Sequence, residues 1–198
     1  MATGLIDRKL ETRAAKLEKK ISGLKEELAA IHRKGKPRAV PDYVFRRHDG
    51  KPLRLSQAFG RHKDLVLVHN MGTFCPYCTL WADGFVSLLP HLQDRAGFLV
   101  VSNDPPEKQK AFAKSRGWTF PMASSHGTAF FAEMGFADKN GNFWPGFTTF
   151  RRKGKRVERV ARRFFGPGDD FCSAWHFFDL LREGSNGWQP KFSYPAKG

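Results

Sequence analysis

Apolar residues recur at helical spacing near the start of the chain. The segment 6–32 has no proline and a single glycine, so we expect one long helix there. Its apolar residues are spaced alternately four and three positions apart, the heptad pattern of a coiled coil: Leu10, Ala14, Leu17, Ile21, Leu24, Leu28 and Ile31. This stripe can pack on a second copy of the chain, giving a homodimer, or on the chain's own domain. Residues 33–41 end the helix and link it to the rest of the chain.

From Tyr43 onward, short apolar runs predict strands. Two of these runs, which begin at Asp64 and Gly97, are continuously apolar, as is typical of strands buried on both faces of a parallel sheet. A turn signal at His48–Gly50 separates two shorter strands, and a hairpin turns near Lys153. The expected strands are therefore the pair around 48–50, then 64–71, 97–104, 118–125 and the hairpin 147–164.

Helical patterns alternate with these strands. We expect helices over 76–89, where Pro90 kinks or restarts the helix, and over 105–117 and 171–181. Strands that alternate with helices predict an α/β fold, with a parallel or mixed sheet covered by helices on both faces. The chain then divides into an N-terminal helical arm, an α/β domain and an irregular tail: 1–37, 38–184 and 185–198.

Length and composition limit the class of protein. With 198 residues, of which 40% are hydrophobic, the chain can bury the core of one domain with an appendage. No apolar run approaches the ~20 residues that cross a bilayer, so we expect no membrane partner. The N-terminus lacks the apolar stretch of a secretory signal, and we therefore expect a cytoplasmic protein.

The chain is strongly basic. Lys and Arg number 34 against 19 Asp and Glu, a formal net charge of +15, which favours acidic partners including nucleic acids. Arg151, Lys153 and Lys155 would share one face of the predicted hairpin. No aromatic residue or recognition helix accompanies them there. A basic binding module is therefore an alternative function, and we expect only weak, sequence-independent binding of nucleic acid.

Two of the three cysteines form a Cys-Pro-Tyr-Cys motif between a predicted strand and a predicted helix. Cys75 would open the helix, where free N–H groups and the helix dipole stabilise a thiolate, and Pro76 would take the first helical position. Cys78 lies one turn further on the same face, at a Cα separation of ~5–6 Å that a disulfide can bridge. The pair therefore predicts a redox couple in which Cys75 attacks a disulfide and Cys78 resolves the product.

Two other interpretations of the motif stay open. A zinc site needs four ligands, and neither Cys172 nor the histidines supply a second pair at ligand spacing. The two thiols can also be small buried apolar groups, which is our expectation for Cys172. We expect no metal and no cofactor.

The residues around the motif carry a family resemblance. Strand, Cys-Pro-Tyr-Cys and helix are similar to the thioredoxin superfamily, and the motif is also that of dithiol glutaredoxins. The stretches CPYCTLWADGF, SRGWTFPMASSHG and FFGPGDDFCSAWHFFDLL resemble a bacterial thioredoxin-like family catalogued as domain of unknown function 899. The resemblance covers most of the chain. It implies a mixed central sheet flanked by helices, with extra strands and a long helix before the core.

The resemblance also implies an activity, a thiol–disulfide oxidoreductase. Its substrate would be a protein or small-molecule disulfide, and a cellular thiol would reduce it again. Phe74 stands where thioredoxins carry Trp, and His69 stands where they keep a buried acid. His69 is therefore either a general base for Cys78 or a hydrogen-bonded core histidine.

Two further positions bear on the site. Peroxiredoxins place Thr or Ser three residues before the reactive Cys, and here that residue is Gly72, which weighs against the alternative of a thiol peroxidase. Pro145 resembles the cis-proline that faces the active-site cysteines in this superfamily. The expected substrate-binding residues are Phe74, Pro76, Tyr77 and Pro145.

Overall fold

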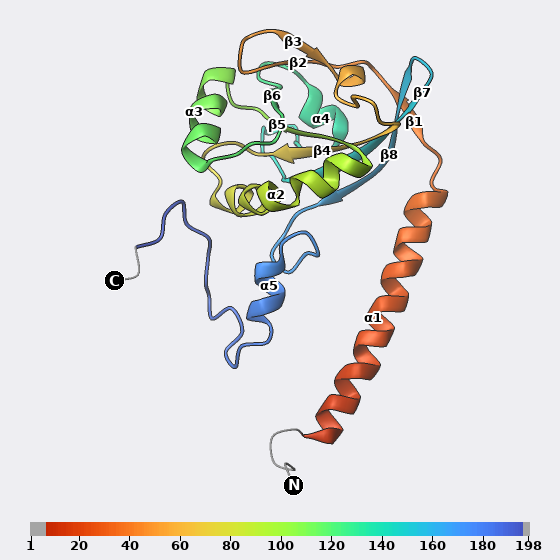
Figure 1. The fold of residues 1–198 in the computed structure, drawn as a ribbon, viewed down its shortest axis with the longest axis vertical. Helices are drawn as coiled ribbons and strands as arrows, with labels where there is room; N and C mark the ends of the chain where they lie inside the picture. Colours follow the sequence, from red (N-terminus) through yellow and green to blue (C-terminus); the bar gives the residue numbers. More distant parts are fainter. Residues whose placement is uncertain (1–6, 196–198) are drawn as a thin grey trace. The chain divides into compact units, whose positions relative to one another are not determined.

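The computed structural model of the protein describes residues 7–195 (Figure 1). The chain divides into two compact units, with the boundary between Lys36 and Pro37. In the described part of the chain, no helix has the length and apolar character needed to cross a membrane.

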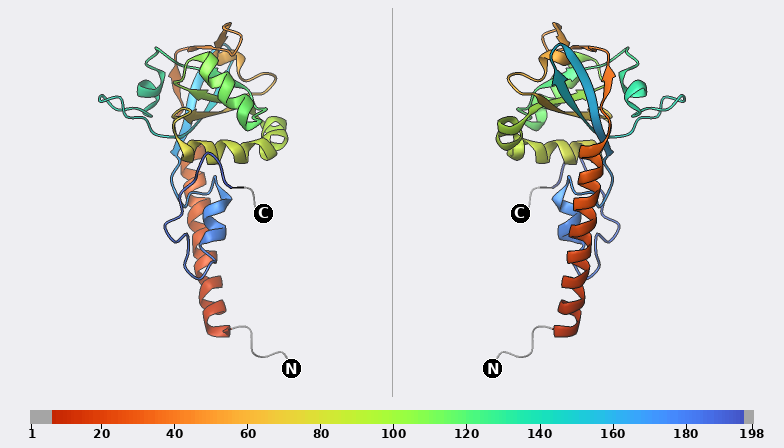
Figure 2. Two further views of the ribbon diagram at one scale, coloured as in Figure 1. Left: turned by 90° about the vertical axis from the view of Figure 1, so that its left-hand side faces the viewer. Right: turned by 90° about the vertical axis from the view of Figure 1, so that its right-hand side faces the viewer.

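The first unit consists of helix α1, Arg8–Lys34, which the two side views of Figure 2 show without a break. Asp7 caps its start, because the carboxylate accepts hydrogen bonds from the N–H groups of Lys9 (3.0 Å) and Leu10 (3.2 Å). The predicted helix is confirmed, although Ile6 lies outside the described residues. No residue of α1 is buried, and its apolar stripe is exposed, from 39% at Leu28 to 66% at Ile31. Nothing within the helix itself covers this apolar stripe.

The second unit is built on one mixed sheet. Its eight strands lie in the order β1-β8-β7-β4-β5-β6-β2-β3. β4, β5 and β6 are parallel neighbours, and every other pairing is antiparallel. The strands are β1 Arg38–Val40, β2 Val44–Arg46, β3 Pro52–Arg54, β4 Asp64–Asn70, β5 Gly97–Ser102, β6 Met122–Ser124, β7 Gly146–Lys153 and β8 Arg156–Phe164.

Both faces of the central strands are buried, as the continuous apolar runs predicted. Along β4, Leu65 and Leu67 belong to one apolar cluster, whereas Val66 and Val68 contact the other. The first cluster lies under the short helices η1, Leu55–Gln57, and α4, Phe130–Met134. The second lies under α2, Pro76–Arg95, α3, Pro106–Arg116, and α5, Ser173–Phe178. Figure 2 accordingly shows α4 on the side of the sheet away from α3.

Several predicted boundaries were wrong. Helix α2 continues through Pro90 to Arg95, because Leu89 on its inner face is buried and holds the last turns on the sheet. Helix α5 ends at Phe178, since the apolar residues that extended the pattern are exposed, Leu180 by 85%. The linker contributes edge strand β1, which pairs with β8, and the strand expected over 118–125 is only β6. Helix α4 was not predicted.

Candidate functional site

Cys75 is the N-cap residue of α2, at the end of the loop that leaves β4. Its Sγ accepts a hydrogen bond from the N–H of Cys78 at 3.1 Å. The backbone carbonyl of Cys75 accepts from both the N–H (3.1 Å) and the hydroxyl (3.0 Å) of Thr79. Pro76 occupies the first turn, where its missing N–H leaves no bond unmade. The sequence therefore places a sulfur atom where helices usually place a capping oxygen.

The pKa values of the two thiols are shifted in opposite directions. The pKa of Cys75 is lowered to about 7, first because the Cys78 thiol donates a hydrogen bond to it, and then because the N–H groups of Cys78 and Tyr77 do the same. Burial opposes this shift. The pKa of Cys78 is raised, because its proton is held by Cys75, because it is buried and because a negative Cys75 repels a second charge. Both cysteines are reduced and buried, with 7% and 3% of their surface exposed. At pH 7 about half of the Cys75 side chains are therefore thiolates, whereas Cys78 is a thiol.

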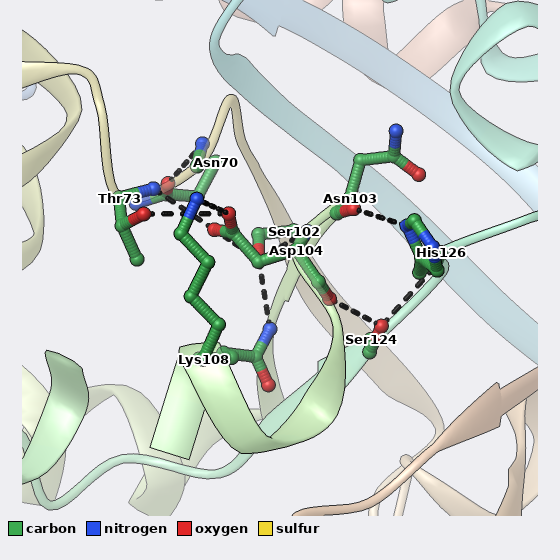
Figure 3. Close-up of polar contacts among 10 residues, drawn as sticks. Asn70, Thr73, Ser102, Asn103, Asp104, Lys108, Ser124 and His126 are labelled. Atoms are coloured by element: carbon green, nitrogen blue, oxygen red, sulfur yellow. Dashed lines mark hydrogen bonds and ion pairs between the residues drawn. The ribbon is translucent and has the colours of Figure 1, made fainter. Parts of the chain in front are cut away.

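A buried carboxylate holds the loop that precedes Cys75. Asp104, 7% exposed, accepts hydrogen bonds from the N–H (2.9 Å) and hydroxyl (3.4 Å) of Thr73 and pairs with Lys108 at 3.3 Å. Figure 3 shows Thr73 and Lys108 pointing at this carboxylate from different elements. Gly72 has φ +133°, and a Cβ there would lie 2.9 Å from Asp104 Oδ2. Only glycine therefore fits at the position where peroxiredoxins carry Thr or Ser.

The network around Asp104 extends along the carboxyl ends of the parallel strands. Ser102 donates to Asp104 Oδ2 (3.3 Å), and Gln109 donates to Ser102 (2.9 Å). The Nε2 of His48 is hydrogen-bonded to the side-chain oxygen of Gln109 at 2.8 Å. The hydroxyl of Ser124 at the end of β6 donates to the Asp104 carbonyl (2.5 Å) (Figure 3). These bonds tie the loop before Cys75 to β5, β6 and α3.

Asp104 was missed in the sequence. Its signal is the polar pair Asn103–Asp104 after the buried run of β5, because ligand and active-site residues of α/β sheets gather beyond the carboxyl ends of parallel strands.

His69 lies deep in the first apolar cluster. Its ring stacks on Phe136 with centroids 3.9 Å apart, and its Nε2 lies 2.9 Å from the Thr148 hydroxyl. In the described part of the chain its Nδ1 has no hydrogen-bond partner. Burial lowers the pKa of His69 well below its usual value, so the imidazole is neutral. His69, Cys78 and Pro145 border one gap that is too narrow for a water molecule. This placement favours the core interpretation, and the role of base for Cys78 stays a prediction.

The expected substrate-binding residues surround the thiols. Phe74, directly before Cys75, is 61% exposed. The Tyr77 ring stacks with that of Trp175 at 6.2 Å. Pro145 lies beside Cys78, across the same narrow gap. Residues 7–195 contain no cis peptide bond, so the bond before Pro145 is trans, unlike that of the cis-proline which Pro145 resembles. Pro145 leads directly into the extended strand β7, which the ordinary trans bond allows.

Other candidate residues lie apart from this site. Cys172 is buried in the second apolar cluster, and burial raises the pKa of its thiol. The basic hairpin is β7–β8, in which Arg151 faces Asp64 at 3.7 Å and the Arg152 guanidinium lies over the Phe59 ring. Among the described residues, no group of three or more His, Cys, Asp or Glu side chains is placed to hold a metal ion.

Solved structures share this arrangement of sheet and helices. Peroxidoxin BcpB from Mycobacterium tuberculosis is similar at 25% identity and a TM-score of 0.53, over 65% of this chain and 84% of that one. Peroxiredoxin Q from Xanthomonas campestris is similar at 22% identity and 0.51, over 62% and 80%. A hypothetical protein from Sinorhizobium meliloti is similar at 18% identity and 0.51, over 80% and 88%. No curated protein matches the sequence.

These likenesses define the class of protein. The second unit has a thioredoxin-like fold with strands added before the core, as the sequence predicted, and the likeness to peroxidoxin BcpB supports thiol redox chemistry as the broad class of function. The family is shown by the sequence itself. Residues 8–194 match the model of the family described as "Bacterial protein of unknown function (DUF899)", and the chain belongs to that family.

Proposed function

We propose that this protein is a thiol–disulfide oxidoreductase that uses Cys75 and Cys78. The feature that supports this most strongly is that the two pKa values are shifted in opposite directions: the pKa of Cys75 is lowered to about 7 and that of Cys78 is raised. Stepwise thiol–disulfide exchange requires a nucleophile that is substantially ionised at neutral pH next to a protonated partner.

The reaction runs in two exchanges. The Cys75 thiolate attacks one sulfur of a substrate disulfide, forms a mixed disulfide and releases the other substrate sulfur as a thiolate, which takes a proton from water. Cys78 then loses its proton and attacks Cys75 Sγ, which releases the second substrate thiol and leaves a Cys75–Cys78 disulfide. Two electrons have passed to the substrate. A cellular thiol reductant returns the pair to the dithiol.

The first exchange also changes the acidity of Cys78. Once Cys75 is bonded to substrate, its sulfur no longer carries the negative charge that raises the pKa of Cys78. Cys78 therefore becomes easier to ionise at the stage when it must attack. The substrate then contacts the exposed Phe74 ring beside Cys75, together with Pro76, Tyr77 and Pro145.

Substrate trapping tests this proposal. Cys78→Ser keeps the attacking thiolate and removes the resolving one, so mixed disulfides with a protein or small-molecule substrate should accumulate on Cys75. Cys75→Ser is the matched control and should trap nothing. If neither variant, or both equally, carries disulfide-linked adducts, Cys75 does not attack disulfides.

A thiol peroxidase is the second candidate, favoured by the likeness to peroxidoxin BcpB. In that reaction the Cys75 thiolate would take the terminal oxygen of a hydroperoxide and become a sulfenic acid, with an alcohol as the other product. Cys78 would then condense with it and release water. Gly72, which packs against the Asp104 carboxylate, provides no hydroxyl at the position where peroxiredoxins carry Thr or Ser, and this weighs against a peroxidase. Peroxide consumption that is faster than reduction of any disulfide would place this function first.

A further inference from the structure

A second concave surface lies at the opposite end of the central strands from Cys75. Cys75 comes after the carboxyl end of β4, whereas Gly97, which pairs with Leu65 near the other end of that strand, lines this second cavity. The volume of the cavity is about 660 Å³, within the range of roughly 300–1,000 Å³ typical of small-molecule sites. Its walls come from the β2–β3 turn, the η1–β4 loop, the end of α2 and the start of β5. The cavity is therefore separate from the thiol site.

The inner part of the cavity is apolar. Leu53, Phe98 and Met122 line it, and each exposes only a small part of an otherwise buried side chain, 4–9% of its surface. Gly97 makes this arrangement possible, because a Cβ there would lie 2.7 Å from the carbonyl oxygen of Ala58. The loop after η1 can therefore rest directly on the start of β5. An apolar surface of this kind binds the body of a ligand and not its charge.

The outer part of the cavity is cationic. Arg47, Arg61 and His62 line it, and within residues 7–195 none of their side chains makes a hydrogen bond or an ion pair. Other arginines of the same unit are paired, such as Arg95 with Asp64 at 3.1 Å. The one carboxylate among the described lining residues, Asp49, bonds within its own turn to the backbone and side chain of Lys51. The guanidinium groups therefore remain available to an anion.

We propose that this cavity binds a small organic anion with an apolar body. The guanidinium groups of Arg47 and Arg61 engage a carboxylate, sulfonate or phosphate group, which they match in geometry as well as in charge. The apolar body of the ligand covers the exposed parts of Leu53, Phe98 and Met122. Inorganic anions lack that body, and uncharged analogues lack the group that the arginines recognise.

The test uses the full-length reduced protein and naphthalene-2-sulfonate as the probe, with binding measured by calorimetry. We expect a dissociation constant in the micromolar range. Arg47→Gln and Arg61→Gln should each weaken binding by about fivefold to tenfold. Arg156→Gln is the matched control: it removes the same charge from an exposed residue of the hairpin and should change affinity by less than about twofold. Naphthalene-2-methanol and inorganic sulfate should each bind at least about tenfold more weakly than the probe.

Three results would overturn the proposal. The first is no binding of the probe at millimolar concentration by the unaltered protein. The second is an equal loss in Arg156→Gln, which would show a general effect of net charge. The third is unchanged affinity in both Arg47→Gln and Arg61→Gln. Thermal unfolding of each variant tests whether the fold is kept. We expect it to be kept, because both arginine side chains lie on the surface.

Discussion

Replacing Cys78 with alanine removes the hydrogen bond that contributes most to the acidity of Cys75. The backbone N–H groups of residues 77 and 78 remain, because alanine keeps its own N–H. The pKa of Cys75 should therefore rise in Cys78→Ala without reaching the value of an unperturbed thiol. Cys78→Ser retains a hydroxyl that can donate to the thiolate and is the matched control.

The size of the effect can be worked from the total shift. The pKa of Cys75 falls from 9.0 to about 7, which corresponds to about 3 kcal/mol in favour of the thiolate. Because the side-chain bond contributes more than either backbone bond, and burial opposes all three, we expect Cys78→Ala to raise this pKa by about one unit, to about 8. The thiolate fraction at pH 7 would then fall from about a half to about a tenth.

The assay is the rate of alkylation by iodoacetamide as a function of pH, with the modified residue identified by mass spectrometry. Cys172 is buried and its thiol has a raised pKa, so it should contribute only a slow background. The unaltered protein and Cys78→Ser should titrate near pH 7, and Cys78→Ala about one unit higher. A midpoint for Cys78→Ala that equals that of the unaltered protein would refute the assigned cause. So would a rise of the same size in Cys78→Ser.

Three further predictions concern the surroundings of the thiols and the first unit. Asp104→Ala leaves the Thr73 N–H without its buried acceptor, so unfolding in urea should show a loss of about 1–3 kcal/mol. Asp104→Asn should restore most of it, and equal losses would show that the carbonyl acceptor is unimportant. His69→Ala should leave the alkylation midpoint unchanged but slow release of the mixed disulfide; unchanged turnover per folded molecule would leave His69 with a core role alone. A chain beginning at Arg38 should sediment as a smaller assembly than the full chain, whose α1 stripe is exposed. Equal assembly states would mean that the helix does not mediate self-association.

The fold was largely readable from the sequence, because the apolar pattern of the central strands is unambiguous. β4 and β5 are buried on both faces, so each carries an uninterrupted apolar run, residues 65–68 and 98–101, and each lies close to its predicted position. The errors fall where packing overrides local pattern. Pro90 lacks an N–H, yet α2 continues past it because burial of Leu89 outweighs one lost bond. Leu180 and Leu181 fit a helical pattern but find no surface to cover, and α5 ends before them.

The candidate site was only half readable. The spacing of Cys75 and Cys78 and the proline between them are local features, and the structure places both thiols at the start of α2. Asp104 contacts this site from the loop after β5, through a hydrogen bond to Thr73, 31 residues earlier, and no local pattern reveals that pairing. The pKa difference between the two thiols could likewise be predicted only in part. The sequence indicates that Cys75 lies at a helix terminus, whereas the largest contribution to its lowered pKa is the hydrogen bond from the Cys78 side chain.

Reversible oxidation of the cysteine pair tests the central claim most directly. The purified protein is treated with a mild oxidant and then with a thiol reductant, and the mass of the peptide that contains Cys75 and Cys78 is measured after each step. We predict the loss of two hydrogen atoms on oxidation, from the thiols of these two residues, and complete recovery on reduction. Cysteines that stay reduced under oxidant, or stoichiometric zinc that chelators remove from the pair, would contradict the account.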